Sequence, residues 1–197
     1  MEKILSRERV KALEEFRRKL IEVLEDSIKK EKNAAIRQAY SNALFNAESI
    51  PIKFVPAKAL SSAVFIAGNR MVTSVVKGQQ VNQIILVQKG KNKYLIKRRE
   101  IDLPAWHLFE GNKLAWNGVH TLMHEYCHGM RELNSFALKL NLSYEQAEEL
   151  IADLLSAKIA LKMNFPKERI LSFYHGRESL YGSFPFWETL KNILSIK

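Results

Sequence analysis

The sequence predicts an α+β protein in which a small antiparallel or mixed sheet is flanked in the chain by a long N-terminal helical segment and a helical C-terminal part. Both flanking regions are rich in charged residues and have apolar residues three and four positions apart, which indicates amphipathic helices. Residues 51–104 instead carry β-branched runs separated by Gly, Pro and Asn, which indicates short strands. We expect the sheet to pack on two helices, one with an HExxH motif and one that bears glutamates.

Residues from about Ser6 to Glu48 contain no Gly or Pro and form the predicted N-terminal helical segment. A break near Lys32-Asn33 would divide it into two helices in series. Its apolar stripe consists of Leu13, Phe16, Leu20, Val23 and Leu24. We expect residues 51–197 to form the main domain. Residues 1–50 would pack on that domain, pair with a partner or a second copy, or cover the functional site as a pro-segment.

Several short runs in the middle of the chain have the composition of strands. Residues 52–55 lie between two prolines, and residues 71–76 are rich in β-branched side chains. Residues 63–67 fit either a strand or a short helix. Residues 81–88 and the run that begins at Tyr94 flank a turn at 90–92, which predicts an antiparallel hairpin.

The C-terminal half predicts further helices. The first covers Asn112 to Leu133 and has a core-facing stripe at helical spacing. The stripe consists of Val119, Leu122, Met123, Tyr126, Cys127, Met130 and Leu133. Ser143 and Gln146 form a capping box that opens a strong helix to about Met163. A last amphipathic helix carries Trp187, Leu190, Ile193 and Leu194.

The first of these helices contains His124-Glu125-Tyr126-Cys127-His128, an HExxH pattern. Positions i and i+4 share one face of a helix, so His124 and His128 can both present a ring nitrogen to one zinc ion. Glu125 can reach a water on that zinc and act as a general base. Cys127 is the only cysteine in the chain, and we expect it to be a buried small hydrophobe rather than a nucleophile.

A catalytic zinc needs a third protein ligand, and the helix after Ser143 offers several carboxylates. The run from Glu149 to Ser156 has Glu-x-x-x-Asp with apolar pairs after each acid. Together with the HExxH helix, this run resembles the gluzincin metallopeptidases, the thermolysin-like clan, and in particular their small single-domain members. The resemblance covers roughly residues 80–160. It implies that Glu149 is the third zinc ligand and that Asp153 orients a ligand histidine.

Neighbouring carboxylates and other families offer alternatives. Glu145 falls in the first helical turn, where it complements the helix dipole, and Glu148 has no acid one turn on. Spartan and SprT-like proteases use a third histidine soon after the motif, and residues 129–142 contain none. Metzincins need a longer histidine pattern that is also missing. Repressor-cleaving metallopeptidases, which pair HExxH with a downstream helical Glu, stay open as relatives.

The gluzincin resemblance also implies a Tyr or His that stabilises the oxyanion from outside the two helices. His175 and Tyr181, with Tyr174 as a further candidate, lie in an irregular C-terminal stretch. His120 lies one helical turn before His124, so we expect it to support the site or line the substrate rather than bind the metal. The strand near residues 84–88, or its hairpin partner, is the expected edge for an extended peptide.

Composition limits the partners and the location. The formal net charge of +10 favours anionic partners such as nucleic acid, although the basic residues are scattered. No run resembles a signal peptide or a membrane span, so we expect a cytoplasmic protein without a membrane partner. The sequence therefore predicts a zinc metallopeptidase that acts on peptides or proteins. Two alternatives are a DNA-associated or regulatory protein with a non-catalytic metal module, and a zymogen held inactive by its N-terminal segment or its aromatic C-terminal tail.

Overall fold

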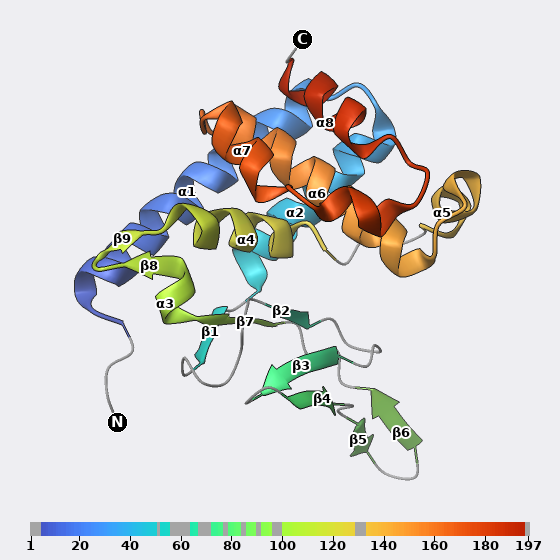
Figure 1. Cartoon of the computed structure of the whole chain (residues 1–197). Helices are drawn as coiled ribbons and strands as arrows, with labels where there is room; N and C mark the ends of the chain where they lie inside the picture. Colours follow the sequence, from blue (N-terminus) through green and yellow to red (C-terminus); the bar gives the residue numbers. More distant parts are fainter. Residues whose placement is uncertain are drawn as a thin grey trace. The chain divides into compact units, whose positions relative to one another are not determined.

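The computed structural model describes residues 5–50, 52–55, 64–66, 72–76, 79–83, 86–89, 92–95, 100–128 and 133–195. In this part of the chain, helices α1 to α8 and short strands form a mostly helical structure, which confirms the predicted α+β class (Figure 1). The chain divides into two compact units that are interleaved in sequence. We call residues 1–14 and 49–125 unit 1, and residues 15–48 and 126–197 unit 2.

The N-terminal segment forms two helices in series, as predicted. Helix α1 (Arg7–Lys30) and helix α2 (Ala34–Ser49) are separated by a short break. At the break, Asn33 Oδ1 accepts hydrogen bonds from the backbone N–H groups of Ala35 and Ile36, so Asn33 caps the start of α2. The predicted apolar stripe of α1 is buried at Leu13, Phe16, Leu20 and Leu24.

The three-stranded sheet of unit 1 is mixed. Strand β7 (Glu100–Pro104) pairs in parallel with β1 (Ile52–Val55) and antiparallel with β2 (Val64–Ile66). The ambiguous run at residues 63–67 is therefore a strand in its described part. Ile101 of the middle strand is buried.

Two antiparallel strand pairs lie between β2 and β7 in the sequence of unit 1. Strand β3 (Val72–Val76) pairs with β4 (Gln79–Gln83), and β5 (Leu86–Lys89) pairs with β6 (Asn92–Leu95). The predicted strand at 71–76 is confirmed over residues 72–76, and the antiparallel pairing across residues 90–92 is confirmed by β5 and β6. The single strand expected at 81–88 is wrong, because its described residues belong to two strands with different partners, β4 and β5. Residues 84 and 85 of the proposed peptide-binding strand lie outside the described residues.

The prediction of one helix from Asn112 to Leu133 is wrong at both ends. Helix α3 (Ala105–Leu108) leads into a hairpin of β8 (Phe109–Glu110) and β9 (Lys113–Leu114), and only then does α4 (Trp116–Tyr126) begin. Gly111 turns this hairpin with φ of 61°, a left-handed conformation that favours glycine.

Gly118 lets α4 approach α3 closely. A Cβ at this position would lie 2.1 Å from the backbone oxygen of His107 and 2.5 Å from the Cα of Leu108. Those distances are far below any real contact, and both atoms belong to the backbone. Glycine is therefore required at residue 118 by packing, although glycine disfavours helix formation.

Unit 2 contains the C-terminal helices. Helix α6 (Tyr144–Lys162) begins at the predicted capping box: Ser143 Oγ accepts from the Gln146 N–H, and the Gln146 side chain accepts from the Ser143 N–H. Helix α5 (Asn134–Leu140) precedes it and was not expected from the sequence. After α6 come α7 (Lys167–Phe173), a 3-10 turn η1 (Arg177–Tyr181) and α8 (Phe186–Leu194).

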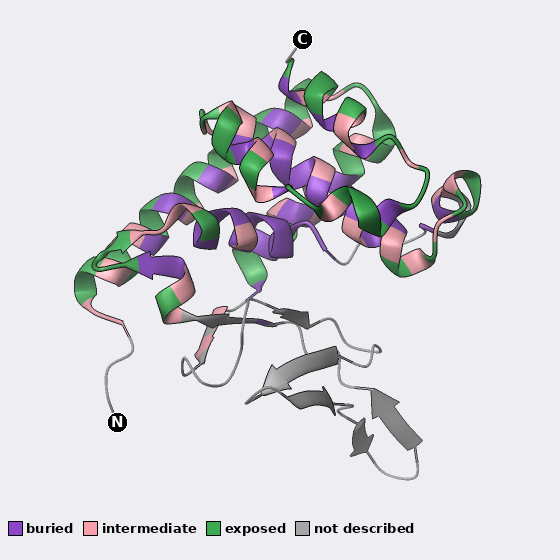
Figure 2. Ribbon diagram, viewed as in Figure 1, coloured by how far each residue is buried: buried purple, intermediate pink, exposed green. Residues whose placement is uncertain are grey.

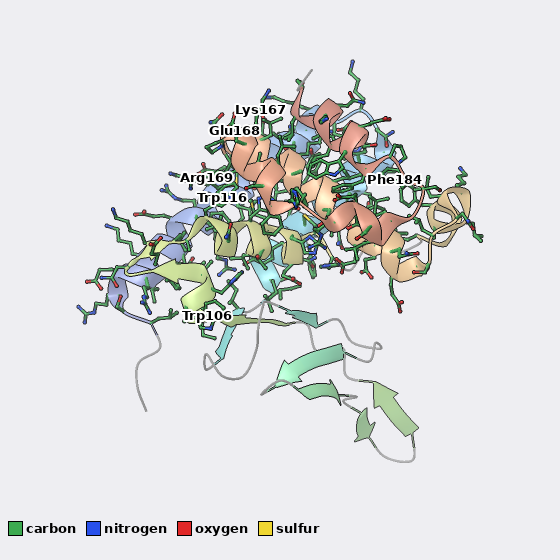
Figure 3. The ribbon with its side chains drawn as sticks, viewed as in Figure 1. Trp106, Trp116, Lys167, Glu168, Arg169 and Phe184 are labelled. Carbon is green, nitrogen blue, oxygen red and sulfur yellow. The ribbon has the colours of Figure 1, made fainter. Side chains whose placement is uncertain are left out.

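Helix α6 is the central helix of unit 2, since α5, α7, η1 and α8 all pack on it. Its buried residues occupy several sides, as the purple ribbon in Figure 2 shows. An aromatic cluster lies beside it: the Phe186 ring centroid is 5.9 Å from that of Tyr174 and 5.1 Å from that of Tyr181. Charged side chains line the outside, such as Glu168 and Arg169 at the start of α7 (Figure 3). None of the described helices has the length and apolar character needed to cross a membrane.

Candidate metal site

The HExxH segment forms a buried group of metal-ligand atoms. His124 and Glu125 lie in the last turn of α4, and His128 follows just beyond the end of the helix. Their exposed fractions are 5%, 7% and 8%, and one ligand atom from each lies within 4.8 Å of the others. Two imidazoles and a carboxylate gathered out of solvent suit a divalent transition metal, so the group could hold a metal ion.

Two asparagines of α2 fix the backbone around His128. Asn46 Nδ2 donates to the carbonyl oxygens of Tyr126 and His128, both at 2.8 Å, and Asn42 Nδ2 donates to the same His128 oxygen at 3.0 Å. Tyr126 is the last residue of α4 and His128 lies just beyond it, so the hydrogen bonds within the helix do not reach these two carbonyls, and the asparagine amides donate to them instead. Asn46 is fully buried, so this anchor belongs to the core of unit 2.

Glu149 of α6 lies next to His128. Its Oε1 is 3.5 Å from His128 Nε2, within unit 2. Its other oxygen, Oε2, accepts a hydrogen bond from Arg177 Nη2 at 2.9 Å. Among the other predicted carboxylates, Glu145 is exposed in the first helical turn and Glu148 is buried in α6. The side chain that the gluzincin resemblance singled out thus lies beside a motif histidine.

Asp153, one turn after Glu149, is fully buried and surrounded by donors. Its Oδ2 accepts a hydrogen bond from the Tyr181 hydroxyl and forms an ion pair with Arg177 Nε at 2.7 Å. Its backbone oxygen accepts from the Tyr174 hydroxyl at 2.8 Å. We predicted that Asp153 orients a ligand histidine; these contacts join it instead to the C-terminal segment, and the histidine role stays a prediction.

The predicted oxyanion donors fall into two classes. Tyr181 and Tyr174 are both fully buried, and each hydroxyl is already bonded, to the Asp153 carboxylate and to its backbone oxygen respectively. Burial, together with the nearby Asp153 charge, raises the pKa of each phenol well above the ordinary value for tyrosine. Both hydroxyls donate hydrogen bonds within the core, and the oxyanion role of Tyr181 stays a prediction. His175 is exposed in the turn before η1, and its catalytic role stays a prediction.

Three further side chains near the motif, His120, His107 and Cys127, make contacts that belong to packing. His120 is fully buried, with its ring 5.4 Å from the Trp116 ring in an edge-on arrangement. His107 Nε2 lies 3.0 Å from Thr121 Oγ1, and burial lowers the pKa of His107. Cys127 is buried and has no disulfide, as predicted for a small core hydrophobe.

Sequence reasoning missed Arg177 and the two asparagines. All three are polar residues in segments whose pattern predicts only packing or an irregular turn, and their partners lie far away in the chain. One signal was available for Arg177: two acids one helical turn apart at one site need a nearby cation. No protein-family model, curated protein or solved structure matches this chain.

Proposed function

We propose that this protein is a zinc-dependent metallopeptidase whose metal is held by His124, His128 and Glu149. The observation that carries the proposal is the 3.5 Å separation between His128 Nε2 and Glu149 Oε1. Two atoms that bind one tetrahedral zinc at ~2.1 Å each lie about 3.4 Å from one another. The same separation is too long for a strong hydrogen bond, so it fits shared coordination better than direct bonding.

The donor set also fits the chemistry of hydrolysis. Two histidines and one glutamate are the ligands of a catalytic zinc that keeps a position open for water. Zinc bound there would lower the pKa of its water and polarise the scissile carbonyl. All three HExxH residues are buried, which limits the access of bulk solvent to their ligand atoms.

Glu125 is the proposed general base. Its carboxylate belongs to the same group of ligand atoms as His124 and His128, within 4.8 Å. From there it would accept a proton from the attacking water and return it to the leaving amine. The proposed substrate is therefore a peptide or protein, and the bond cleaved is an amide.

Two measurements on the full chain test the proposal. Wild-type protein is expected to bind one zinc per chain by elemental analysis and to cleave casein or a fluorogenic peptide mixture. Glu125→Gln is expected to keep the zinc and to lose about 10²-fold or more in cleavage rate, because only the proton acceptor is removed. Glu145→Gln, an exposed glutamate of α6, is the matched control and should leave both unchanged.

The outcomes separate the site from the reaction. A wild-type chain that binds no zinc contradicts the metal site. A Glu125→Gln variant that binds zinc and cleaves as fast as the wild type contradicts the role of Glu125 and hence the mechanism.

A further inference from the structure

A guanidinium bridges the two acids of the Glu149–Asp153 pair. Arg177 Nη2 donates to Glu149 Oε2 at 2.9 Å, and Arg177 Nε lies 2.7 Å from Asp153 Oδ2. The two acids are one turn apart on α6, and Arg177 begins η1. All three residues belong to unit 2. One cation thus connects the proposed metal ligand to a fully buried carboxylate.

We infer that Arg177 is a positioning residue that holds Glu149 in a ligating orientation by bridging it to Asp153. The inference rests on the proposed function, because it assumes that Glu149 binds the metal. It concerns a residue outside the proposed set of metal ligands and outside the HExxH and Glu-x-x-x-Asp patterns.

The two carboxylate oxygens of Glu149 have different partners. Arg177 takes Oε2, while Oε1 faces His128 Nε2 at 3.5 Å. A glutamate side chain that is 41% exposed would otherwise rotate among several rotamers. With one oxygen held by a charge-assisted hydrogen bond, the other is left pointing toward the motif histidine.

Asp153 makes the bridge rigid. Its side chain is fully buried, and burying a carboxylate costs free energy unless the group is paired with a cation and hydrogen-bonded. Arg177 supplies the cation, and the Tyr181 hydroxyl donates to the same Oδ2. The backbone at Asp153 is held in turn by Tyr174 and Ser156, whose hydroxyls bond to its carbonyl oxygen. The guanidinium is therefore anchored on its buried side and presents a fixed donor to Glu149.

Lysine could not replace this geometry. An ammonium group is a point charge, whereas the planar guanidinium offers donors at fixed separation to two carboxylates at once. Arg177→Lys is expected to keep the charge balance with Asp153 but to hold Glu149 less well.

The test is zinc affinity, measured on the full chain by competition with a chromophoric chelator. Arg177→Gln is expected to weaken zinc binding about 10- to 100-fold, the usual effect of removing a group that orients a ligand, with Arg177→Lys in between. Arg37→Gln, which changes an exposed arginine of α2, is the matched control and should bind zinc like the wild type. Thermal unfolding of each metal-free variant confirms that it is folded at the assay temperature.

A double-mutant cycle with Glu149→Gln separates positioning from general destabilisation. If Arg177 acts through Glu149, Arg177→Gln should cause little further loss of zinc affinity in the Glu149→Gln background. An equal loss in both backgrounds, or unchanged affinity in both folded variants of Arg177, overturns the inference while leaving the proposed site intact. If Arg177→Gln does not fold, the same cycle with Arg177→Lys decides. A wild-type chain that binds no zinc overturns the proposed function and this inference together.

Discussion

The strongest prediction about the folded chain concerns the two asparagines that share one acceptor. Asn42 and Asn46 both donate to the carbonyl oxygen of His128, and Asn46 donates also to that of Tyr126. Either amide alone leaves the His128 oxygen with a donor, whereas removing both takes both away. We therefore expect Asn42→Ala and Asn46→Ala to be non-additive in the free energy of unfolding.

The magnitudes follow from the contacts. Asn42→Ala removes one shared hydrogen bond at a partly buried site and should cost about 1 kcal/mol or less. Asn46→Ala removes two hydrogen bonds from a fully buried side chain and should cost roughly 1–3 kcal/mol. Loss of the buried Asn46 Oδ1, which has no hydrogen-bond partner among the described residues, offsets part of that cost. The double variant should lose more unfolding free energy than the sum of the two single losses, by about 1 kcal/mol or more. The excess is the cost of removing both asparagine donors from the buried carbonyl.

Urea denaturation of the metal-free full chain measures all four members of the cycle. Ser41→Ala, which removes a hydrogen bond to Arg37 O within α2, provides the control cycle with Asn46→Ala and should be additive. Additivity of Asn42→Ala and Asn46→Ala to within about 0.5 kcal/mol would refute the shared-acceptor reasoning.

Two further predictions concern unit 1. Gly118→Ala should destabilise the chain by at least about 2 kcal/mol, because its Cβ would overlap the backbone of His107 and Leu108. Gly111→Ala is the control: its Cβ meets nothing within 4 Å, so it should cost only the strain of its left-handed φ, about 1 kcal/mol. Equal losses in thermal unfolding would show that the α3–α4 approach is not tight. Burial lowers the pKa of His107 below 6.5, so the folded state favours the neutral ring. The unfolded chain therefore takes up the proton first as the pH falls below about 6.5, and the free energy of unfolding decreases there. His107→Gln, which can still bond Thr121, should flatten that decline in unfolding free energy between about pH 7 and 5; an unchanged pH slope would contradict the assignment.

Local patterns predicted the helices that carry the site. The capping box of Ser143 and Gln146 fixed the start of α6, and the spacing of Glu149 and Asp153 put both acids one turn apart on that helix. The core stripe placed Tyr126 and Cys127 inside. Each of these features depends on residues within a few positions of one another, which periodicity and capping rules can detect.

The parts that could not be predicted depend on contacts between distant segments. His128 and Asn46 are 82 residues apart, and Glu149 and Arg177 are 28 residues apart. An asparagine within a helix, or an arginine before a 3-10 turn, carries no local sign that it will meet a backbone carbonyl or a carboxylate. The start of α4 was also mispredicted: residues 112–114, expected in the helix, belong to the β8–β9 hairpin, and α4 begins at Trp116.

The asparagine contacts also bear on the role of the N-terminal segment. A removable pro-segment would be expected to touch a site through side chains that block it, and its loss would raise activity. Helix α2 instead donates from a fully buried side chain to the backbone that carries His128. Because this bond supports the segment that holds a proposed ligand, α2 is better understood as part of the scaffold of unit 2. On this reasoning, Asn42→Ala and Asn46→Ala should weaken zinc binding rather than raise peptidase activity.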